Sequence, residues 1–170
     1  MVSGVLIGHK VIVSKEDKQY FTRKYFGEET DSGLELSLEE ALFLKEKGKI
    51  DIIDKKGKKI STQEFIRTAQ RANKRFTQRY AVFSDMRSHG YIIKTALKYG
   101  GDFRAYDKGE IPGQDHARWI VYVMREHDSL DARLLAAINR IAHSVKKSLL
   151  IAVVDDENSV TYYESNWMRL

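Results

Sequence analysis

Three residues in the second half of the chain have side chains suited to proton transfer or to anion binding: Tyr106, His116 and Lys147. A histidine titrates near pH 6.5 and can donate a proton at neutral pH, whereas a lysine stays cationic and can stabilise developing negative charge. Each also has an ordinary explanation. The chain has nine tyrosines, a histidine entering a strand often caps or packs, and a lysine ending a helix favours the helix dipole. Residue type alone therefore defines no site here.

A metal site is the competing possibility. The histidines are residues 9, 89, 116, 127 and 143, and no two of them stand at ligand spacing on one expected element. Asp155-Asp156-Glu157 is the carboxylate cluster that adjoins an apolar strand, where a two-metal nuclease would need it. The same residue types are ordinary in a hairpin turn, which is the interpretation we favour. Because the chain has no cysteine and no phosphate-binding glycine motif, we expect neither a metal nor a cofactor.

The composition is that of a globular protein with a mild preference for a polyanionic partner. Hydrophobic residues make up 42% of the 170 residues and charged residues 31%, which excludes disordered and fibrous classes. The net charge of +5 lies mostly in residues 1–75, which carry 16 basic and 12 acidic groups against 13 and 12 in residues 76–170. Residues 1–14 resemble two strands rather than a signal peptide, and no run approaches membrane-spanning length. We expect a cytoplasmic protein that does not contact a membrane.

Local signals in the first half predict alternating strands and helices. Val2–Ile7 and Lys10–Val13 should form a hairpin, and a helix should run from Ser14 to about Gly27. Capping boxes at Ser37 and Ser61 should each open a helix, the first ending at Gly48 and the second carrying apolar positions as far as residue 76. A strand is expected at 50–54. The second of these helices has a basic face that either follows an RNA backbone or is simply solvated: Arg67, Arg71, Lys74 and Arg75.

Local signals in the second half of the chain predict a mixed sheet with a helix packed on it. A helical segment should end at His89, before Gly90. Strands are expected at 91–98, 103–106, 118–124, 149–154 and 160–163, with one clear amphipathic helix beginning at Asp128 or Ser129. The fold class is therefore α+β. We predict a small N-terminal domain of mixed α/β content at 1–76 and a C-terminal mixed-sheet domain, with a helix packed on the sheet, at 77–170.

Several stretches of the chain carry a resemblance to one known family, most strongly from residue 79 onward: Arg79–Tyr91, Lys94–Gly100, Asp102–Tyr106 and Ala142–Leu150 with Val154-Asp155. These stretches are similar to the catalytic domain of the archaeal tRNA-splicing endonucleases, and Leu36–Leu44 is more loosely similar to the N-terminal domain of that family. His116 follows Tyr106 by ten residues and precedes Lys147 by 31, which is the catalytic spacing of the family.

The resemblance implies a metal-independent RNA endonuclease. Such enzymes cut precursor tRNA at bulge-helix-bulge junctions and leave 2′,3′-cyclic phosphate and 5′-hydroxyl ends. By resemblance, Tyr106 is the general base, His116 the general acid and Lys147 the cation near the phosphate. Lys146 competes for the last role, but alternation along the strand that follows puts the two lysines on opposite sides, and the spacing selects Lys147.

The resemblance also implies RNA-binding and assembly residues. Arg140 precedes Lys147 by seven residues, so the two should overlook one groove, where the family stacks an arginine on a flipped base. Trp167 is a second stacking candidate, although a terminal tryptophan also packs at interfaces. Family members of this length are homotetramers, formed as dimers of dimers through an acidic loop. Asp128 and Asp131 fit that loop and equally fit helix N-caps.

Three alternatives remain from the sequence. The first is a non-catalytic RNA-binding or scaffold subunit with the same fold. Another is a metal-dependent nuclease that uses Asp155 and Asp156. The third is a basic RNA chaperone without nuclease activity. Strand cleavage in EDTA separates all three from the metal-independent enzyme.

Overall fold

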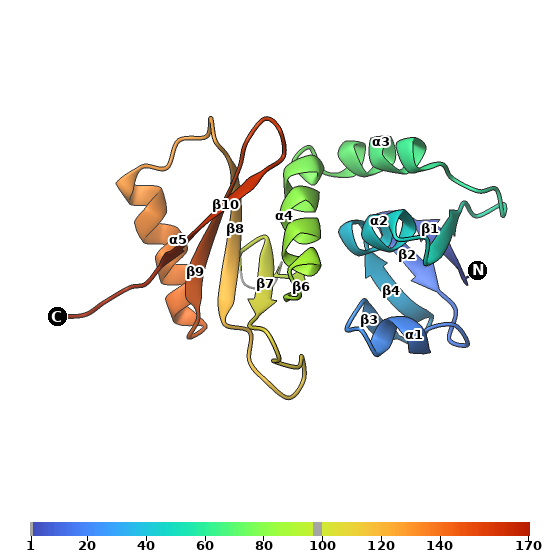
Figure 1. Cartoon of the computed structure of the whole chain (residues 1–170), viewed down its shortest axis with the longest axis horizontal. Helices are drawn as coiled ribbons and strands as arrows, with labels where there is room; N and C mark the ends of the chain where they lie inside the picture. Colours follow the sequence, from blue (N-terminus) through green and yellow to red (C-terminus); the bar gives the residue numbers. More distant parts are fainter. Residues whose placement is uncertain (1, 97–99) are drawn as a thin grey trace. The chain divides into compact units, whose positions relative to one another are not determined.

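The computed structural model describes residues 2–96 and 100–170, and the chain divides into two compact units, Met1–Thr77 and Gln78–Leu170. Each unit contains a five-stranded sheet with helices beside it (Figure 1). The predicted α+β class is confirmed. The part of the strand predicted at residues 97–98 falls outside the described residues. No helix in the described ranges is long and apolar enough to span a bilayer.

The first unit is built on a mixed sheet of order β3-β4-β2-β1-β5, in which only β1 and β5 pair in parallel. The predicted hairpin is confirmed with its bounds, and Gly8 in its turn has φ 60°. The elements of the first unit are β1 (Val2–Ile7), β2 (Lys10–Val13), α1 (Gln19–Thr22), β3 (Glu28–Thr30), β4 (Gly33–Ser37), α2 (Leu38–Glu46), β5 (Ile50–Ile53) and α3 (Thr62–Ala72).

The two predicted helix starts in this unit are confirmed. Ser37 Oγ accepts the Glu40 N–H at 3.2 Å and the Glu40 carboxylate accepts the Ser37 N–H at 2.9 Å, which completes a capping box. Ser61 Oγ accepts the Glu64 N–H at 3.1 Å. The end of the second helix was predicted too late. Asn73 is extended at φ −144°, so α3 ends at Ala72, and residue 76 opens the next helix instead.

The long helix predicted from Ser14 to Gly27 is wrong. Only α1, a single turn, forms there, and the Ser14 hydroxyl donates to the Asp17 carboxylate at 3.0 Å instead of capping a helix. The chain then turns through left-handed conformations at Tyr25 and Gly27. That turn lets Phe26, which is buried, follow Phe21 into the core, so burial outweighs local helix propensity.

The second unit is a mixed sheet of order β10-β9-β8-β7-β6, in which β8 and β9 are parallel and every other pair is antiparallel. A helix, α5, makes the crossover between the two parallel strands. The elements are α4 (Phe76–Ser88), which opens at the unit boundary, β6 (Ile92–Thr95), β7 (Phe103–Tyr106), β8 (Trp119–Arg125), α5 (Ala132–Ser144), β9 (Ser148–Val154) and β10 (Val160–Ser165).

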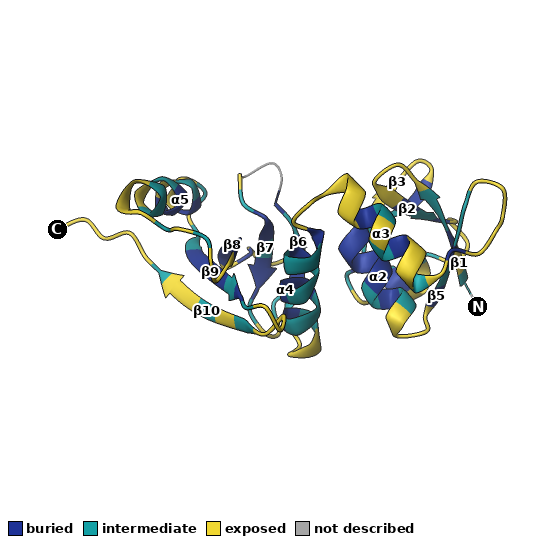
Figure 2. Cartoon of the chain, turned by 90° about the horizontal axis from the view of Figure 1, so that it is seen from above, coloured by how far each residue is buried: buried dark blue, intermediate teal, exposed yellow. Residues whose placement is uncertain are grey.

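Helices cover both faces of this sheet (Figure 1). On one face Phe83 of α4 lies against Phe103 of β7, with ring centroids 6.2 Å apart. On the other face α5 packs Ile138 and Ala142 against strand residues that include Ile120. The prediction of a helix on the sheet is therefore confirmed, and α4 adds a second covered face. Figure 2 shows β7 deeply buried, whereas much of β10 and the C-terminal tail are exposed.

Helix α5 begins later than predicted. Asp131 is its N-cap and accepts the Leu134 N–H at 2.8 Å. Asp128, the expected start, accepts the Arg125 N–H at 2.8 Å and closes the loop after β8. Its carboxylate is thus already engaged upstream, and the helix is capped at Asp131 instead of at Asp128 or Ser129.

Candidate active site at one end of the second sheet

The topology brings three chain segments to one end of the second sheet. Tyr106 is the last residue of β7, Arg118 immediately precedes β8, and Lys147 immediately precedes β9. Backbone bonds hold these ends together: Arg118 N–H donates to Ala105 O at 2.9 Å and Ser148 N–H donates to Arg118 O at 3.0 Å. Neighbouring strands lie about 4.8 Å apart. Because β7 is antiparallel to β8, it ends at the same end of the sheet at which the parallel strands β8 and β9 begin. Residues far apart in sequence therefore lie at one end of the sheet.

The Lys147 side chain reaches the segment that carries His116. Its Nζ donates to Ala117 O at 2.8 Å from a half-buried position. Lys146 is exposed in the left-handed conformation with φ 57°. Lys147, and not its neighbour, therefore contacts the segment that carries His116.

Tyr106 is the most enclosed of the three predicted catalytic residues. Its relative exposure is 5%. Among the described residues, the unpartnered side-chain polar atoms that are fully buried are Arg104 Nε and Trp119 Nε1. The structure gives the Tyr106 hydroxyl no hydrogen bond within the described residues, and little of the residue is exposed.

His116 lies exposed on the loop between β7 and β8. The structure gives its imidazole no hydrogen bond within the described residues. The loop around it is nevertheless ordered by its own carboxylates. Glu110 accepts the Asp107 N–H at 2.7 Å, and Asp115 accepts the Ile111 N–H at 2.7 Å. The backbone therefore fixes where His116 stands, and the ring remains free to approach a substrate.

An ion pair that sequence reasoning missed closes the base of this loop. Arg118 Nη1 donates to Asp107 Oδ2 at 2.5 Å. This hydrogen bond holds the pKa of Asp107 below its usual value and raises the pKa of Arg118. Arg118 also lies 3.5 Å from Glu164 Oε2 and 4.5 Å from the Trp119 ring centroid. The signal in the sequence is a pair of opposite charges flanking the loop, which no local periodicity distinguishes from other exposed charges.

The predicted RNA-stacking residues lie on or near α5. The argument that placed Arg140 and Lys147 two helical turns apart is wrong, because α5 ends at Ser144 and Lys147 lies beyond the helix. Arg140 is exposed on α5. Trp167 is 50% exposed and packs on His143, with ring centroids 4.3 Å apart. RNA stacking by Arg140 and Trp167 remains a prediction.

Both residues of the predicted docking loop have partners within the chain. Asp131 caps α5 as described above, so its capping role is confirmed. Asp128 accepts the Arg125 side chain, with Nη2 to Oδ1 at 3.0 Å, in addition to the backbone bond. A role for either carboxylate in an interface with another copy of the chain stays a prediction.

The carboxylates of the metal-dependent alternative lie at the opposite end of the sheet. Asp155 accepts the N–H groups of two later residues of its turn, at 2.9 Å and 2.8 Å, which confirms the turn interpretation. Asp156 lies 3.2 Å from His127 Nε2, and this contact and nearby Glu126 raise the pKa of His127. The ligand atoms of these three residues fall within 4.8 Å of one another and all are exposed. The seven-residue length of β8, about 20 Å, separates them from Lys147.

Comparison with known proteins identifies the family. Residues 76–162 match the model of the tRNA intron endonuclease catalytic C-terminal domain, and residues 2–66 match that of the tRNA intron endonuclease N-terminal domain. Both halves thus point to one class of protein, a two-unit α+β chain whose second sheet brings the segments that carry Tyr106, His116 and Lys147 to one end. The chain belongs to the tRNA intron endonuclease family.

Relatives extend over nearly the whole chain. The tRNA-splicing endonuclease of Thermococcus onnurineus is 39% identical, covering 91% of this chain and 88% of that protein. The tRNA-splicing endonuclease of Methanothermobacter thermautotrophicus is 36% identical, covering 96% of both. That of Methanococcus vannielii is 38% identical, covering 94% of this chain and 90% of that protein. The likeness therefore includes both units and the segments that carry the candidate site.

Proposed function

We propose that this chain is a tRNA-intron endonuclease that cleaves precursor tRNA at bulge-helix-bulge junctions. Residues 1–76 are its N-terminal domain and residues 77–170 its catalytic domain. Family membership of both halves supports the substrate class. The observation that carries the proposal is the Lys147 ammonium on the carbonyl next to His116, at the sheet end where the Tyr106 strand terminates.

The proposed reaction needs no group from outside the chain and its substrate. Tyr106 takes the proton of the substrate 2′-hydroxyl as the 2′-oxygen attacks phosphorus. The bond from phosphorus to the 5′-oxygen breaks, and His116 gives that oxygen a proton. Lys147 stabilises the charge that builds on the phosphate oxygens during attack. The products are a 2′,3′-cyclic phosphate and a 5′-hydroxyl end, and both side chains return to their starting protonation through solvent.

The function is tested by incubating the purified chain with a model bulge-helix-bulge RNA in excess EDTA. We expect cleavage at both bulges, with end-group analysis giving 2′,3′-cyclic phosphate and 5′-hydroxyl ends. A perfectly paired RNA of the same length serves as the control and should stay intact. Binding without cleavage would instead indicate the scaffold subunit or the RNA chaperone, and activity that returns only with a divalent metal would indicate the metal-dependent nuclease.

The general base is tested by Tyr106→Phe, which keeps the buried ring and removes only the hydroxyl. We expect the single-turnover cleavage rate to fall about 10–100-fold, at or below the lower limit of the 10²–10⁴-fold that general acid–base groups usually contribute, because a phenol is a less common general base than an imidazole or a carboxylate. Tyr163→Phe, which alters an exposed tyrosine on β10, is the matched control. A near-normal rate for Tyr106→Phe removes the phenol from the mechanism.

The assembly and location of the enzyme follow from the same proposal. A bulge-helix-bulge has two cleavage sites related by an approximate two-fold axis, and one chain carries one catalytic set, so at least two copies act together. We propose a cytoplasmic homotetramer, a dimer of dimers, in which the exposed loop with Asp128 and Asp131 docks into a basic pocket of another copy. Arg140 and Trp167 are the proposed contacts to the bulge bases.

A further inference from the structure

We propose that the Asp107–Arg118 ion pair fixes the position of the loop that carries His116 relative to Lys147. The inference rests on the proposed function and adds two residues to its machinery. Neither residue is proposed to touch the reacting atoms. Both act through the backbone that carries the imidazole.

The need for such a device follows from the exposure of His116. Its ring is exposed and has no hydrogen bond within the described residues, so the position of its backbone is important for where the ring stands. The loop spans residues 107–117, between the end of β7 and the residue before β8. An exposed connection of this length does not hold a catalytic side chain without cross-links, because loops of this size are otherwise mobile.

Most of the cross-links of the loop are local. Glu110 and Asp115 each close a turn of three or four residues on the backbone, as described above. The bond from Asp107 to Arg118 differs because it joins residues eleven apart, at the two ends of the loop. Within the described residues, this hydrogen bond therefore links the two ends of the loop through their side chains.

Arg118 is itself held on several sides, which makes it a suitable anchor. Its backbone N–H donates to Ala105 O at 2.9 Å. Its guanidinium lies on the Trp119 ring and 3.5 Å from the Glu164 carboxylate of β10, in addition to Asp107. A guanidinium satisfied by two carboxylates has less to offer a phosphate than a free one. These contacts favour a structural role for Arg118 over direct contact with RNA.

The effect of the anchor on the rate should be much larger than its effect on stability. The pair is exposed, and exposed ion pairs contribute little to folding. A displacement of about 1 Å in a catalytic group can nevertheless cost about 100-fold in rate. Loss of the pair should therefore lower the cleavage rate about 10–100-fold while the thermal midpoint stays almost unchanged.

The test is a charge-swap cycle with Asp107→Arg, Arg118→Asp and the double variant. Each single variant should cleave the bulge-helix-bulge RNA about 10–100-fold more slowly in single turnover, and the double variant should recover to within about threefold of the wild type. Lys146→Asp is the matched control, because it makes the same charge change as Arg118→Asp at an exposed neighbour of Lys147. Its left-handed backbone also suits aspartate.

Three outcomes overturn the proposal in the cleavage arm. A double variant that stays as slow as Arg118→Asp means that Arg118 contacts the RNA directly. A rate in Lys146→Asp that falls as far as in Arg118→Asp means that general attraction to RNA, and not loop position, is being measured. Single variants that cleave normally also overturn it.

A second measurement needs no activity. Amide hydrogen exchange of residues 108–117 should rise in both single variants and return to the wild-type level in the double variant. If the wild-type chain leaves the RNA intact, the proposed function fails, and the exchange data alone decide whether the ion pair holds the loop. Unchanged exchange in the single variants overturns the anchor whatever the cleavage result.

Discussion

His116→Ala is expected to lower the single-turnover cleavage rate about 10²–10⁴-fold, the range that a positioned general acid contributes. The substitution removes the proton donor for the departing 5′-oxygen. Because the side chain is exposed and has no recorded hydrogen bond in the described chain, its loss should leave folding and RNA affinity close to wild type. His9→Ala, at the exposed turn of the β1–β2 hairpin, is the matched control and should cleave normally.

A change of leaving group identifies the role of the histidine. In an RNA whose scissile 5′-oxygen is replaced by sulfur, the departing thiolate needs no proton. His116→Ala should then cleave this substrate within about tenfold of the wild-type rate. A loss as large as that on the normal RNA would exclude the general-acid role and leave His116 as a binding residue.

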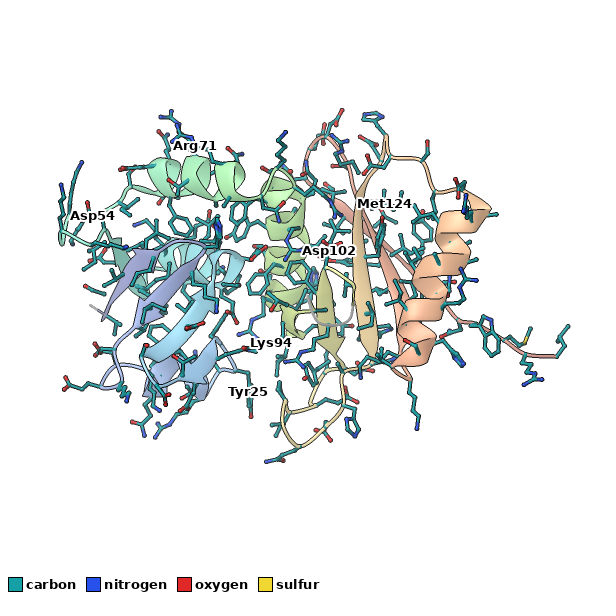
Figure 3. All side chains as sticks on the ribbon, turned by 180° about the vertical axis from the view of Figure 1, so that it is seen from behind. Tyr25, Asp54, Arg71, Lys94, Asp102 and Met124 are labelled. Carbon is teal, nitrogen blue, oxygen red and sulfur yellow. The ribbon has the colours of Figure 1, made fainter. Side chains whose placement is uncertain are left out.

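Asp102→Ala is expected to destabilise the second unit by about 3–5 kcal/mol, the usual cost of breaking a buried ion pair by removing one partner. Asp102 Oδ1 accepts Arg79 Nη1 at 2.7 Å and Oδ2 accepts the Val123 N–H at 2.8 Å, and both charged side chains are 8% exposed. Asp102 lies between α4 and the sheet (Figure 3). The alanine leaves the Arg79 guanidinium buried without this carboxylate and an amide of β8 without its acceptor.

The measurement can be confined to the second unit. Both tryptophans of the chain, Trp119 and Trp167, belong to it, so urea unfolding followed by tryptophan fluorescence reports on that unit. Asp102→Asn should lose less stability, because an amide oxygen can still accept from Val123. Arg125→Ala removes an exposed ion pair and should hardly move the midpoint. A midpoint for Asp102→Ala as little changed as that of Arg125→Ala would contradict the expectation.

Elements with strong local signals were predicted closely. The hairpin with Gly8, the Ser37 capping box and the strand Phe103–Tyr106 all appear with the expected bounds or within a residue of them. The errors occur where tertiary contacts outweigh local preference. The predicted helix from Ser14 fails because burial of Phe26 bends the chain. The start of α5 moves because Arg125 already engages Asp128, a contact that spacing does not reveal.

The candidate site could be predicted only in part, for the same reason. Residue chemistry and the resemblance select Tyr106, His116 and Lys147, but the contact of Lys147 with the segment of His116 depends on a hydrogen bond between residues thirty apart. The helical spacing used for Arg140 failed because the chain leaves the helix three residues before Lys147. The Asp107–Arg118 pair carries no local signal at all. Arg71, exposed on α3 (Figure 3), belongs to the basic face predicted from the sequence, and contact of that face with RNA stays a prediction.

The contact of Lys147 with Ala117 has one more consequence. An ammonium group has three N–H directions. One is occupied by the Ala117 carbonyl, which leaves two for the equatorial oxygens of a phosphodiester. The same hydrogen bond couples the two segments, so a shift of the segment that carries His116 alters a contact of the ammonium, and the proposed proton donor and charge stabiliser are not positioned independently.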